Sequence, residues 1–311
     1  MHHSTTTKPS MDRREFMANS TLAAGAAAGL LATAAATPSA VAAPKHSFMK
    51  SLKMGMITRE DADGNPLSIE DRLAIAKNAG FASVEPATIF DDKTLGEYSK
   101  AIEKLDFSVD AVVCANQWGN PLSDADPAVY EKTMMAMRKS IENVKALGGD
   151  MVLLVPAVVN PGTRYEDAWT RSVERIKILA EDAERAGVTI GIENVWNKFL
   201  LSPLEARAFV DEIDSKYVQS WLDVGNMIQF GYPQDWIRTL GHRIARVDIK
   251  DFRRNGNAFV ELGKGDVDWP EVMKAFGEIG YQGYGAAEVK GGDLAYLTKA
   301  VSKPMDTFFA M

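Results

Sequence analysis

Short apolar runs alternate along this chain with longer amphipathic stretches. The clearest run is Val188 to Glu193, where valine and isoleucine alternate with small or polar residues and the run ends in a carboxylate. An ionised carboxylate is costly to bury unpaired, so an acid in this position is not there to fill the core. Three later runs end in the same way, at Asp223, Asp248 and Glu288.

The alternation continues through the chain. It predicts strands at about 52–57, 81–84, 108–114, 150–155, 188–193, 218–223, 244–248 and 283–288, each followed by a helix. Ser68 and Ser202 stand at predicted helix starts as N-caps, and the last helix is expected from Asp293 towards Val301. Eight β-then-α repeats predict an α/β fold, a single-domain (β/α)8 TIM barrel over residues 50–305. An open doubly wound sheet is the alternative, but no Gly-x-Gly-x-x-Gly follows the first strand.

The first 43 residues have the features of a twin-arginine signal peptide. Arg13 and Arg14 precede a modest Ala/Gly/Leu-rich stretch at 21–35, and small residues follow at 39–43. A membrane anchor is the alternative, but the apolar run is too short and too rich in Ala and Gly to span a bilayer. The pattern therefore predicts export to the periplasm, with no stable membrane span after the signal is removed.

Composition excludes several classes of protein. The chain has 311 residues and a formal net charge of −7, with no Lys/Arg-rich run, which argues against nucleic-acid binding. Cys114 is the single cysteine, so neither an intramolecular disulfide nor a cysteine zinc cluster is expected. His242 precedes a predicted strand, at the wrong end for a barrel mouth. No Gly-x-Ser-x-Gly supports a serine hydrolase.

In a barrel of this kind the carboxyl ends of the strands meet at one mouth. Glu193, Asp223, Asp248 and Glu288 are then expected to converge from the last four strands. Several carboxylates in one small volume repel each other unless a cation lies among them, and oxygen-rich sites suit Mn²⁺, Mg²⁺ or Co²⁺. For any single acid, a helix cap or a surface salt bridge is the plainer interpretation.

Five segments together resemble the xylose isomerase-like barrels, in particular the sugar phosphate isomerase/epimerase group with its ketose 3-epimerases and inosose dehydratase. They are Gly191-Ile192-Glu193-Asn194, Leu222-Asp223-Val224-Gly225-Asn226, Val247-Asp248-Ile249-Lys250-Asp251, the run from Leu262 to Trp269, and the last strand with Gly283-Tyr284 and Ala287-Glu288. The resemblance covers nearly all of the chain after the signal. The same barrels resemble endonuclease IV, but that nuclease needs several histidines that this chain lacks.

The resemblance implies metal ligands at Glu193, Asp223 and Glu288. Where the family usually has a histidine this chain has Asp248, and where it often has a second histidine it has Asn226. With Asp248 the site becomes all-carboxylate, which favours Mn²⁺ or Mg²⁺ over Zn²⁺. Alternatively, Asp248 lies outside the coordination sphere and the metal binds weakly or not at all.

Such a site suits chemistry next to a sugar carbonyl. A metal would act as a Lewis acid, and Glu193 and Glu288 would remove and return a proton through an enediolate. This predicts a metal-dependent isomerase or epimerase of a small sugar or keto-sugar. A lyase that eliminates a β-substituent from a 3-keto-sugar or keto-glycoside shares the intermediate. A barrel that binds carbohydrate without turnover is the third interpretation.

Further residues are candidates for contacts with the sugar, and each also has a purely structural interpretation. Arg254 matches a family position that binds substrate oxygens, or is a solvated loop charge; Lys250 and Glu85 contact substrate or form salt bridges. Trp118 and Trp196 form an apolar wall for the sugar or belong to the core. Asn116 and Asn226 complete the candidate set. Related barrels often form dimers or tetramers, but the sequence shows no interface.

Overall fold

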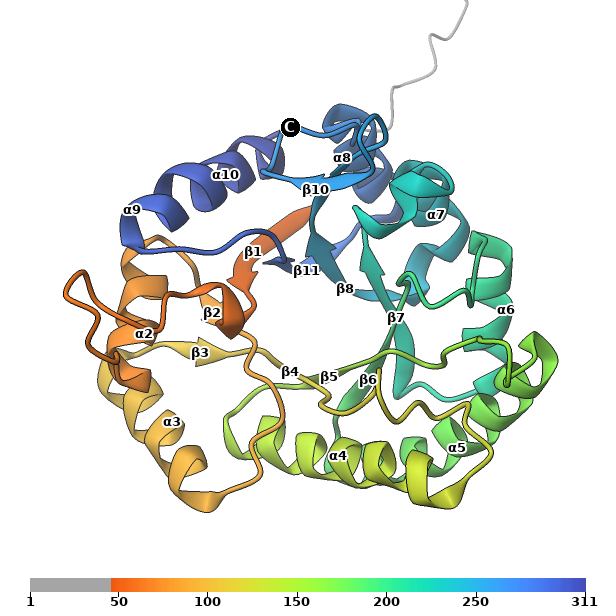
Figure 1. The fold of residues 1–311 in the computed structure, drawn as a ribbon. Helices are drawn as coiled ribbons and strands as arrows, with labels where there is room; N and C mark the ends of the chain where they lie inside the picture. The colour runs from red at the N-terminus through yellow and green to blue at the C-terminus, as the bar shows by residue number, and fades with distance from the viewer. Residues whose placement is uncertain (1–45) are drawn as a thin grey trace, which may run out of the picture. The chain divides into compact units, whose positions relative to one another are not determined.

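Parallel strands form the inner wall of a barrel, and helices surround them (Figure 1). The structure is a computed structural model, which describes residues 46–311, and the predicted signal peptide at 1–43 lies outside them. The described residues form one compact unit. The barrel strands are β1 (Ser47–Leu52), β2 (Ser83–Val84), β3 (Ser108–Val109), β4 (Ala111–Val113), β5 (Met151–Leu154), β6 (Thr189–Glu193), β7 (Val218–Asp223), β8 (Ile244–Ile249) and β11 (Gln282–Ala287).

The strand order closes the barrel. One sheet runs β1-β11-β8-β7-β6-β5-β4, and β2 and β3 pair with each other in parallel. Single bridges from Lys53 to Glu85 and from Ala87 to Val113 join this pair to both edges of the larger sheet. Because β3 and β4 are two parts of one strand interrupted at Asp110, the barrel wall has eight strands. The predicted (β/α)8 barrel is confirmed.

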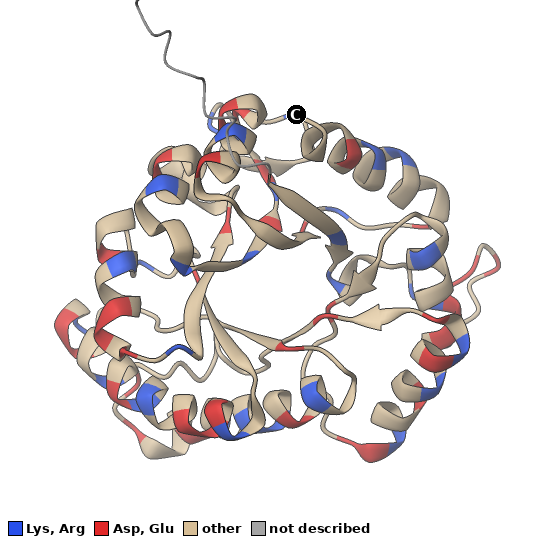
Figure 2. Ribbon diagram, turned by 180° about the vertical axis from the view of Figure 1, so that it is seen from behind, with Lys and Arg blue, Asp and Glu red and all other residues tan. Residues whose placement is uncertain are grey.

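Helices follow the strands in the predicted alternation and carry most of the charged residues (Figure 2). The main helices are α2 (Ile69–Asn78), α3 (Asp92–Leu105), α4 (Pro127–Ala146), α5 (Tyr165–Ala186), α6 (Pro203–Ile213), α7 (Pro233–Leu240), α8 (Trp269–Ile279), α9 (Leu294–Tyr296) and α10 (Lys303–Phe309). The short helical turns are η1 (Met54–Met56), η2 (Asn226–Gln229), η3 (Gly241–Arg243) and the π-helical η4 (Leu297–Ser302). None of the described helices is long and apolar enough to cross a membrane.

Local signals explain where the helices begin and end. Ser68 and Ser202 each form a capping box. The serine hydroxyl accepts a hydrogen bond from the amide three residues on, and the acidic side chain of that residue accepts one from the serine amide. Gly187 ends α5 with φ +66°, a left-handed conformation that favours glycine. Both predicted serine N-caps are confirmed.

Two predicted boundaries were wrong. The first strand ends at Leu52 instead of beginning there, because Met54–Met56 form a 3₁₀ turn at its carboxyl end. The last helical segment continues past Val301 to Phe309, because π-helical turns link α9 directly to α10. Pro304 lies in the first turn of α10, where a proline is tolerated. The barrel therefore begins before residue 50 and ends after residue 305.

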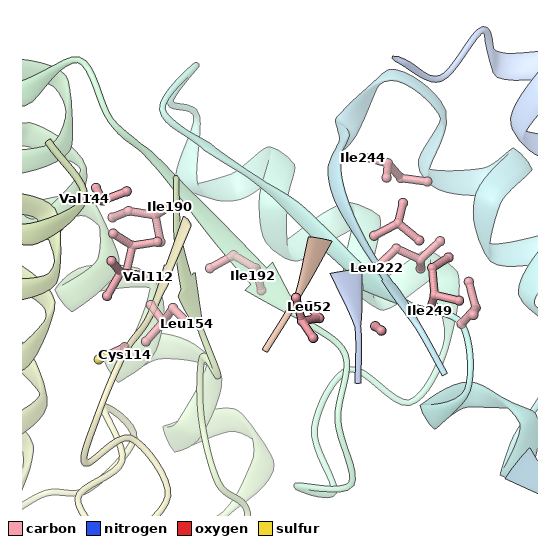
Figure 3. Packing of buried hydrophobic residues seen from close by; sticks show 14 of the residues in the cluster. Leu52, Val112, Cys114, Val144, Leu154, Ile190, Ile192, Leu222, Ile244 and Ile249 are labelled. Carbon is pink, nitrogen blue, oxygen red and sulfur yellow. The ribbon is translucent and has the colours of Figure 1, made fainter. Parts of the chain in front are cut away.

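Alternate residues of each strand face the helices or the barrel interior. Figure 3 shows Val112, Ile190 and Leu154 in the layer that also contains Val144 of α4. A separate apolar cluster contains Ala111, Met151, Leu153 and Trp221. Because side chains alternate along a strand, this second set lies on the opposite, inner face. The inner face is the one that carries the acids.

Candidate active site

Strand alternation directs the four predicted acids into the barrel. Ile190 and Ile192 pack in the layer beneath the helices, so Gly191 and Glu193 face inward. A Cβ added at Gly191 would lie 2.6 Å from Met151 Cε and 2.8 Å from Trp221 Cε3. Glycine at this position therefore makes room for Trp221, which forms the floor beneath the acids.

The four acids meet at the carboxyl ends of the strands. One carboxylate oxygen from each of Glu193, Asp223, Asp248 and Glu288 lies within 4.8 Å of the other three. The first three are buried, and Glu288 is partly exposed. The predicted convergence is confirmed, and this cluster is the acidic centre of the site.

Lys53 is a site residue that the sequence reasoning missed. Its ammonium Nζ lies 2.8 Å from Asp248 Oδ1 and 2.5 Å from Glu85 Oε2, and 4.5 Å from the centroid of the Trp221 ring. The predicted first strand hid it, because a strand beginning at Leu52 gives Lys53 no special place. Because β1 ends at Leu52, Lys53 is the first residue after a strand. A position at a strand end is the same signal that identified the acids.

Lys250 lies on the other side of the acidic centre. Its Nζ is 3.3 Å from both Asp223 Oδ2 and Glu288 Oε2. Gly225 permits this approach, because a Cβ there would lie 2.8 Å from the Cβ of Lys250. Of the two interpretations of Lys250, ion pairing with acids is the one the structure shows.

Burial and mutual repulsion raise the pKa values of three of the acids, and nearby lysines lower that of Glu288. Burial, then the charges of Glu288 and Asp248, raise the pKa of Glu193 well above its usual value. Burial likewise raises the pKa of Asp248 strongly, against the pull of Lys53, and that of Asp223 to about 6. Burial alone would also raise the pKa of Glu288, but Lys250 and Lys53 outweigh it and lower that pKa.

The arrangement fits a divalent cation. Asp223 Oδ2, both oxygens of Asp248 and Glu288 Oε2 are buried and accept no hydrogen bond of good geometry, although lysine charges lie nearby. Lys53 is shared with Glu85, so the two ammonium groups face five carboxylates, and the excess of negative charge would be offset by a divalent ion. Oxygen donors alone suit Mg²⁺ or Mn²⁺ better than Zn²⁺.

Two asparagines hold the Asp223 corner in place. Asn194 Nδ2 donates to the Asp223 carbonyl, and Asn194 Oδ1 accepts from the Asp223 amide, both at 2.9 Å. The Asp223 carboxylate accepts from the amides of Gly225 and Asn226 at 2.7 Å, and Asn226 Nδ2 donates back to the Asn194 carbonyl. The Asn of Gly-Ile-Glu-Asn is therefore a positioning residue.

Two cavities adjoin the acidic centre and share Glu193, Glu288 and Trp118. The inner cavity, of about 270 Å³, is also lined by Lys53, Gly55, Glu85, Ala87, Val113, Gln117 and Leu153. The outer cavity, of about 210 Å³, is also lined by Val195, Trp196, Asn226, Lys250 and Phe259. A third cavity of about 480 Å³ adjoins His242 and Val218, at the amino ends of β7 and β8. That is the barrel end associated with stability.

Candidate substrate residues divide between the cavities and their surroundings. At least one of the two cavities is lined by each of Glu85, Trp118, Trp196, Asn226 and Lys250. The two tryptophans are partly exposed there, at 52% and 37%, which favours the wall over the core interpretation.

Asn116 and Arg254 line neither cavity. Asn116 has φ +68° and turns the chain so that its neighbour Gln117 lines the inner cavity, where Gln117 accepts from the Val155 amide. The Arg254 guanidinium donates to the carbonyls of Ile228 and Gly231. It thereby holds the segment after β7.

Asp251 explains why glycines occur in the Gly263-Lys264-Gly265-Asp266 motif. Its carboxylate accepts from the amides of Gly263 and Gly265 and from the Trp269 indole. A Cβ at Gly265 would lie 2.0 Å from Asp251 Oδ1, so this position requires glycine. Asp251 thus fastens the loop from Leu262 to Trp269 to the hairpin β9 (Asp251–Arg253) and β10 (Ala258–Val260) at the barrel mouth.

Barrel, acidic centre and cavities define a class of protein, an α/β barrel with a carboxylate-lined mouth. The Xylose isomerase-like TIM barrel family matches residues 73–304, and the chain belongs to that family. It is 27% identical over 223 residues to L-ribulose 3-epimerase of Mesorhizobium japonicum, covering 68% of this chain and 72% of that protein.

Solved structures agree on the fold. A D-tagatose 3-epimerase-like protein superposes with a TM-score of 0.70 at 18% identity, covering 84% of this chain and 98% of that one. The IOLI protein, solved with a bound zinc atom, gives a TM-score of 0.71 at 17% identity, covering 85% and 98%.

Proposed function

We propose that this protein is an isomerase or epimerase of a sugar or keto-sugar that moves a proton next to a carbonyl. The observation that carries the proposal is that the Glu193 and Glu288 carboxylates line both cavities within one acidic centre. The related L-ribulose 3-epimerase supports the reaction class. A sugar in the inner cavity would contact both carboxylates.

The two glutamates differ in the way an acid–base pair requires. Lys250 and Lys53 keep Glu288 ionised, so its carboxylate is the group that accepts the proton from carbon. In the ion-free protein, burial among other acids raises the pKa of Glu193, so Glu193 is the more readily protonated glutamate of the pair. Groups whose environments separate their pKa values take opposite roles. Glu193 would return the proton, giving epimerisation on the same carbon or isomerisation on the next.

We propose that Glu193, Asp223 and Glu288 hold a divalent ion, with Asp248 at its edge. Lys53 Nζ lies 2.8 Å from Asp248 Oδ1, closer than the 3.3 Å between Lys250 Nζ and either Asp223 or Glu288, which makes Asp248 the least available ligand. A bound ion would polarise the carbonyl and acidify the neighbouring C–H. Lys53, Lys250 and the ion together would offset most of the negative charge of the acids, so that either glutamate can take up or release the proton.

A lyase remains the second candidate, and the outer cavity is the observation that favours it. That cavity adjoins the same two glutamates and has room for a substituent beyond the sugar. After removal of the proton, loss of this substituent from the β-carbon would be an elimination.

Incubation with keto-sugars in deuterated water tests the proposal. Deuterium should enter the carbon next to the carbonyl, and Glu193→Gln and Glu288→Gln should each lower the rate at least 100-fold. Glu131→Gln, on an exposed helix position, serves as control. Incorporation with an intact skeleton identifies an isomerase or epimerase, and release of a substituent identifies the lyase. Sugar binding without any exchange would show a carbohydrate-binding barrel instead.

We also propose that the chain is exported through its twin-arginine segment. The paired Arg13-Arg14 and the weakly apolar stretch after them support this. Replacing both arginines by lysine should retain the protein in the cytoplasm on cell fractionation. Unchanged fractionation would refute export by this route.

A further inference from the structure

Two cavities of similar size adjoin the reacting glutamates, and the proposed proton transfer needs only one of them. Glu193, Glu288 and Trp118 line both cavities, so the two meet at the acidic centre. At about 270 and 210 Å³, each alone lies below the roughly 300–1,000 Å³ of typical small-molecule sites, and together they fall within that range. The site therefore has room for a ligand that extends through both cavities.

The inner cavity is the one that suits the reacting unit. Its walls include Glu85, Val113 and Leu153, which lie on the barrel strands or directly after them. The outer cavity is lined instead by residues such as Val195 and Phe259, which belong to the segment after β6 and to the β9–β10 hairpin. A sugar carbonyl held among the strand ends leaves the rest of a longer substrate to occupy the outer cavity.

The outer cavity presents polar groups that match sugar hydroxyls. Glu193 and Glu288 offer carboxylate oxygens, and Lys250 offers ammonium N–H groups. Asn226 uses its Nδ2 group on the Asn194 carbonyl, so its Oδ1 oxygen is left as an acceptor. A hydroxyl group both donates and accepts, so these acceptors and this donor can replace the hydrogen bonds to water that a bound sugar loses.

The apolar residues of the outer cavity lie among these polar groups. The Trp196 and Phe259 rings pack against each other at 5.0 Å between centroids, and Lys250 Nζ lies 4.6 Å from the centroid of the Phe259 ring. The two rings therefore cover each other in part, and a charged group lies directly beside them. Such a mixed lining fits a pyranose ring, which carries both C–H groups and hydroxyls, better than a purely apolar group.

The charges around both cavities disfavour an anionic substrate. Lys250 already contacts Asp223 and Glu288, and Lys53 contacts two further acids. These two lysines are the basic side chains among the described residues that line the cavities. A phosphate group would therefore lie beside carboxylates without a basic partner of its own. An uncharged sugar unit meets no such repulsion.

Resting on the proposed function, we infer that the substrate is a keto-disaccharide, in which the sugar that carries the carbonyl occupies the inner cavity and a second, uncharged sugar occupies the outer cavity. The hydroxyls of the second sugar contact Lys250 and Asn226. The glycosidic bond lies where the cavities meet, beside Glu193 and Glu288. A free keto-sugar leaves the outer cavity unfilled, and a sugar phosphate places its charge among the acids.

Kinetics of deuterium exchange and calorimetric titration test this on the full chain with Mn²⁺. The ligands are cellobiose and maltose with a 3-keto group on the non-reducing unit, the methyl 3-keto-β- and α-glucosides, and 3-keto-glucose 6-phosphate. At least one disaccharide should show a kcat/KM and an affinity about tenfold or more above those of the methyl compound with the same linkage, because its second ring gains hydrogen bonds. The phosphate should rank below both.

A variant that fills the outer cavity locates the second sugar. In Val195→Phe the preference for the disaccharide should fall below about twofold, because the larger side chain occupies the space of the second ring. Ile178→Phe, at an exposed position of α5, is the matched control and should keep the preference. The comparison of ligands on wild type decides the inference if Val195→Phe does not fold.

Equal values for the disaccharides and their methyl partners, a phosphate that ranks with the disaccharides, absence of binding by all the compounds, or a preference that survives Val195→Phe would overturn the inference. Exchange is also measured on Glu193→Gln. Exchange that depends on Glu193, without a disaccharide preference, refutes only the second sugar. Tighter binding of a disaccharide without any exchange refutes the proposed reaction and leaves the second-sugar subsite.

Discussion

Asp223→Asn should stabilise the ion-free protein while removing its response to a divalent ion. Asp223 is fully buried, and its pKa is raised from 3.8 to about 6, chiefly by burial. Raising a pKa by one corresponds to about 1.4 kcal/mol of free energy, so the ionised form costs about 3 kcal/mol above pH 6. Asparagine keeps the acceptor for the Gly225 and Asn226 amides but carries no charge.

The pH dependence gives the prediction its sign. The folded pKa lies above the unfolded one, so the cost is absent below about pH 4, is about half developed at pH 5 and is complete above pH 6. With chelator at pH 8, Asp223→Asn should melt about 6 °C higher than wild type. At pH 5 the difference should shrink to about half.

Thermal melts with and without Mn²⁺ at pH 8 complete the test. Wild type should gain about 2.7 kcal/mol at an ion concentration of 100 Kd, and Asp223→Asn should gain almost nothing. Asp211→Asn, which changes an exposed ion pair with Arg243, is the control and should behave like wild type. A variant that is less stable than wild type in chelator, or that keeps its full response to Mn²⁺, would refute the reasoning.

Three further outcomes follow from the same contacts. Lys53→Met leaves the buried Asp248 and Glu85 without their cation and should lower the free energy of unfolding by about 3–5 kcal/mol in denaturant titrations; an effect no larger than that of the exposed control Lys104→Met would contradict this. Mn²⁺ should raise the melting temperature more at pH 8 than at pH 5, because protons compete for the acids; equal shifts would argue against a carboxylate site. Gly191→Ala should cost about 1–3 kcal/mol, since its Cβ would overlap Met151 and Trp221, and an unchanged melting temperature would show that the barrel floor can adjust.

Much of this molecule could be predicted from periodicity. Each barrel strand except the first was located within a few residues, and serine caps located two helix starts correctly. The four acids were identified because they end successive strands, and the barrel topology brings such ends together. The strands, helix starts and acids follow from local patterns, and one topological rule places the strand ends together. A single sequence is therefore enough to predict them.

The ion-pair and hydrogen-bond partners of the charged residues could not be predicted in the same way. Lys53 and Asp248 are far apart in sequence, and their contact depends on where β1 ends and on the closure of β11 against both β1 and β8. Arg254 follows Asp248 closely, yet it turns away to the carbonyls after β7. No periodicity encodes either choice.

The sequence alone determined the strand–helix alternation, the barrel it closes into and the acids at its mouth, because each depends on short-range order along the backbone. Only the tertiary structure decided which cations balance those acids, and that Trp196 and Phe259 pack together beside them. The physical reason is that charge pairing and cavity shape depend on distances between side chains from different strands, which are set only when the barrel closes.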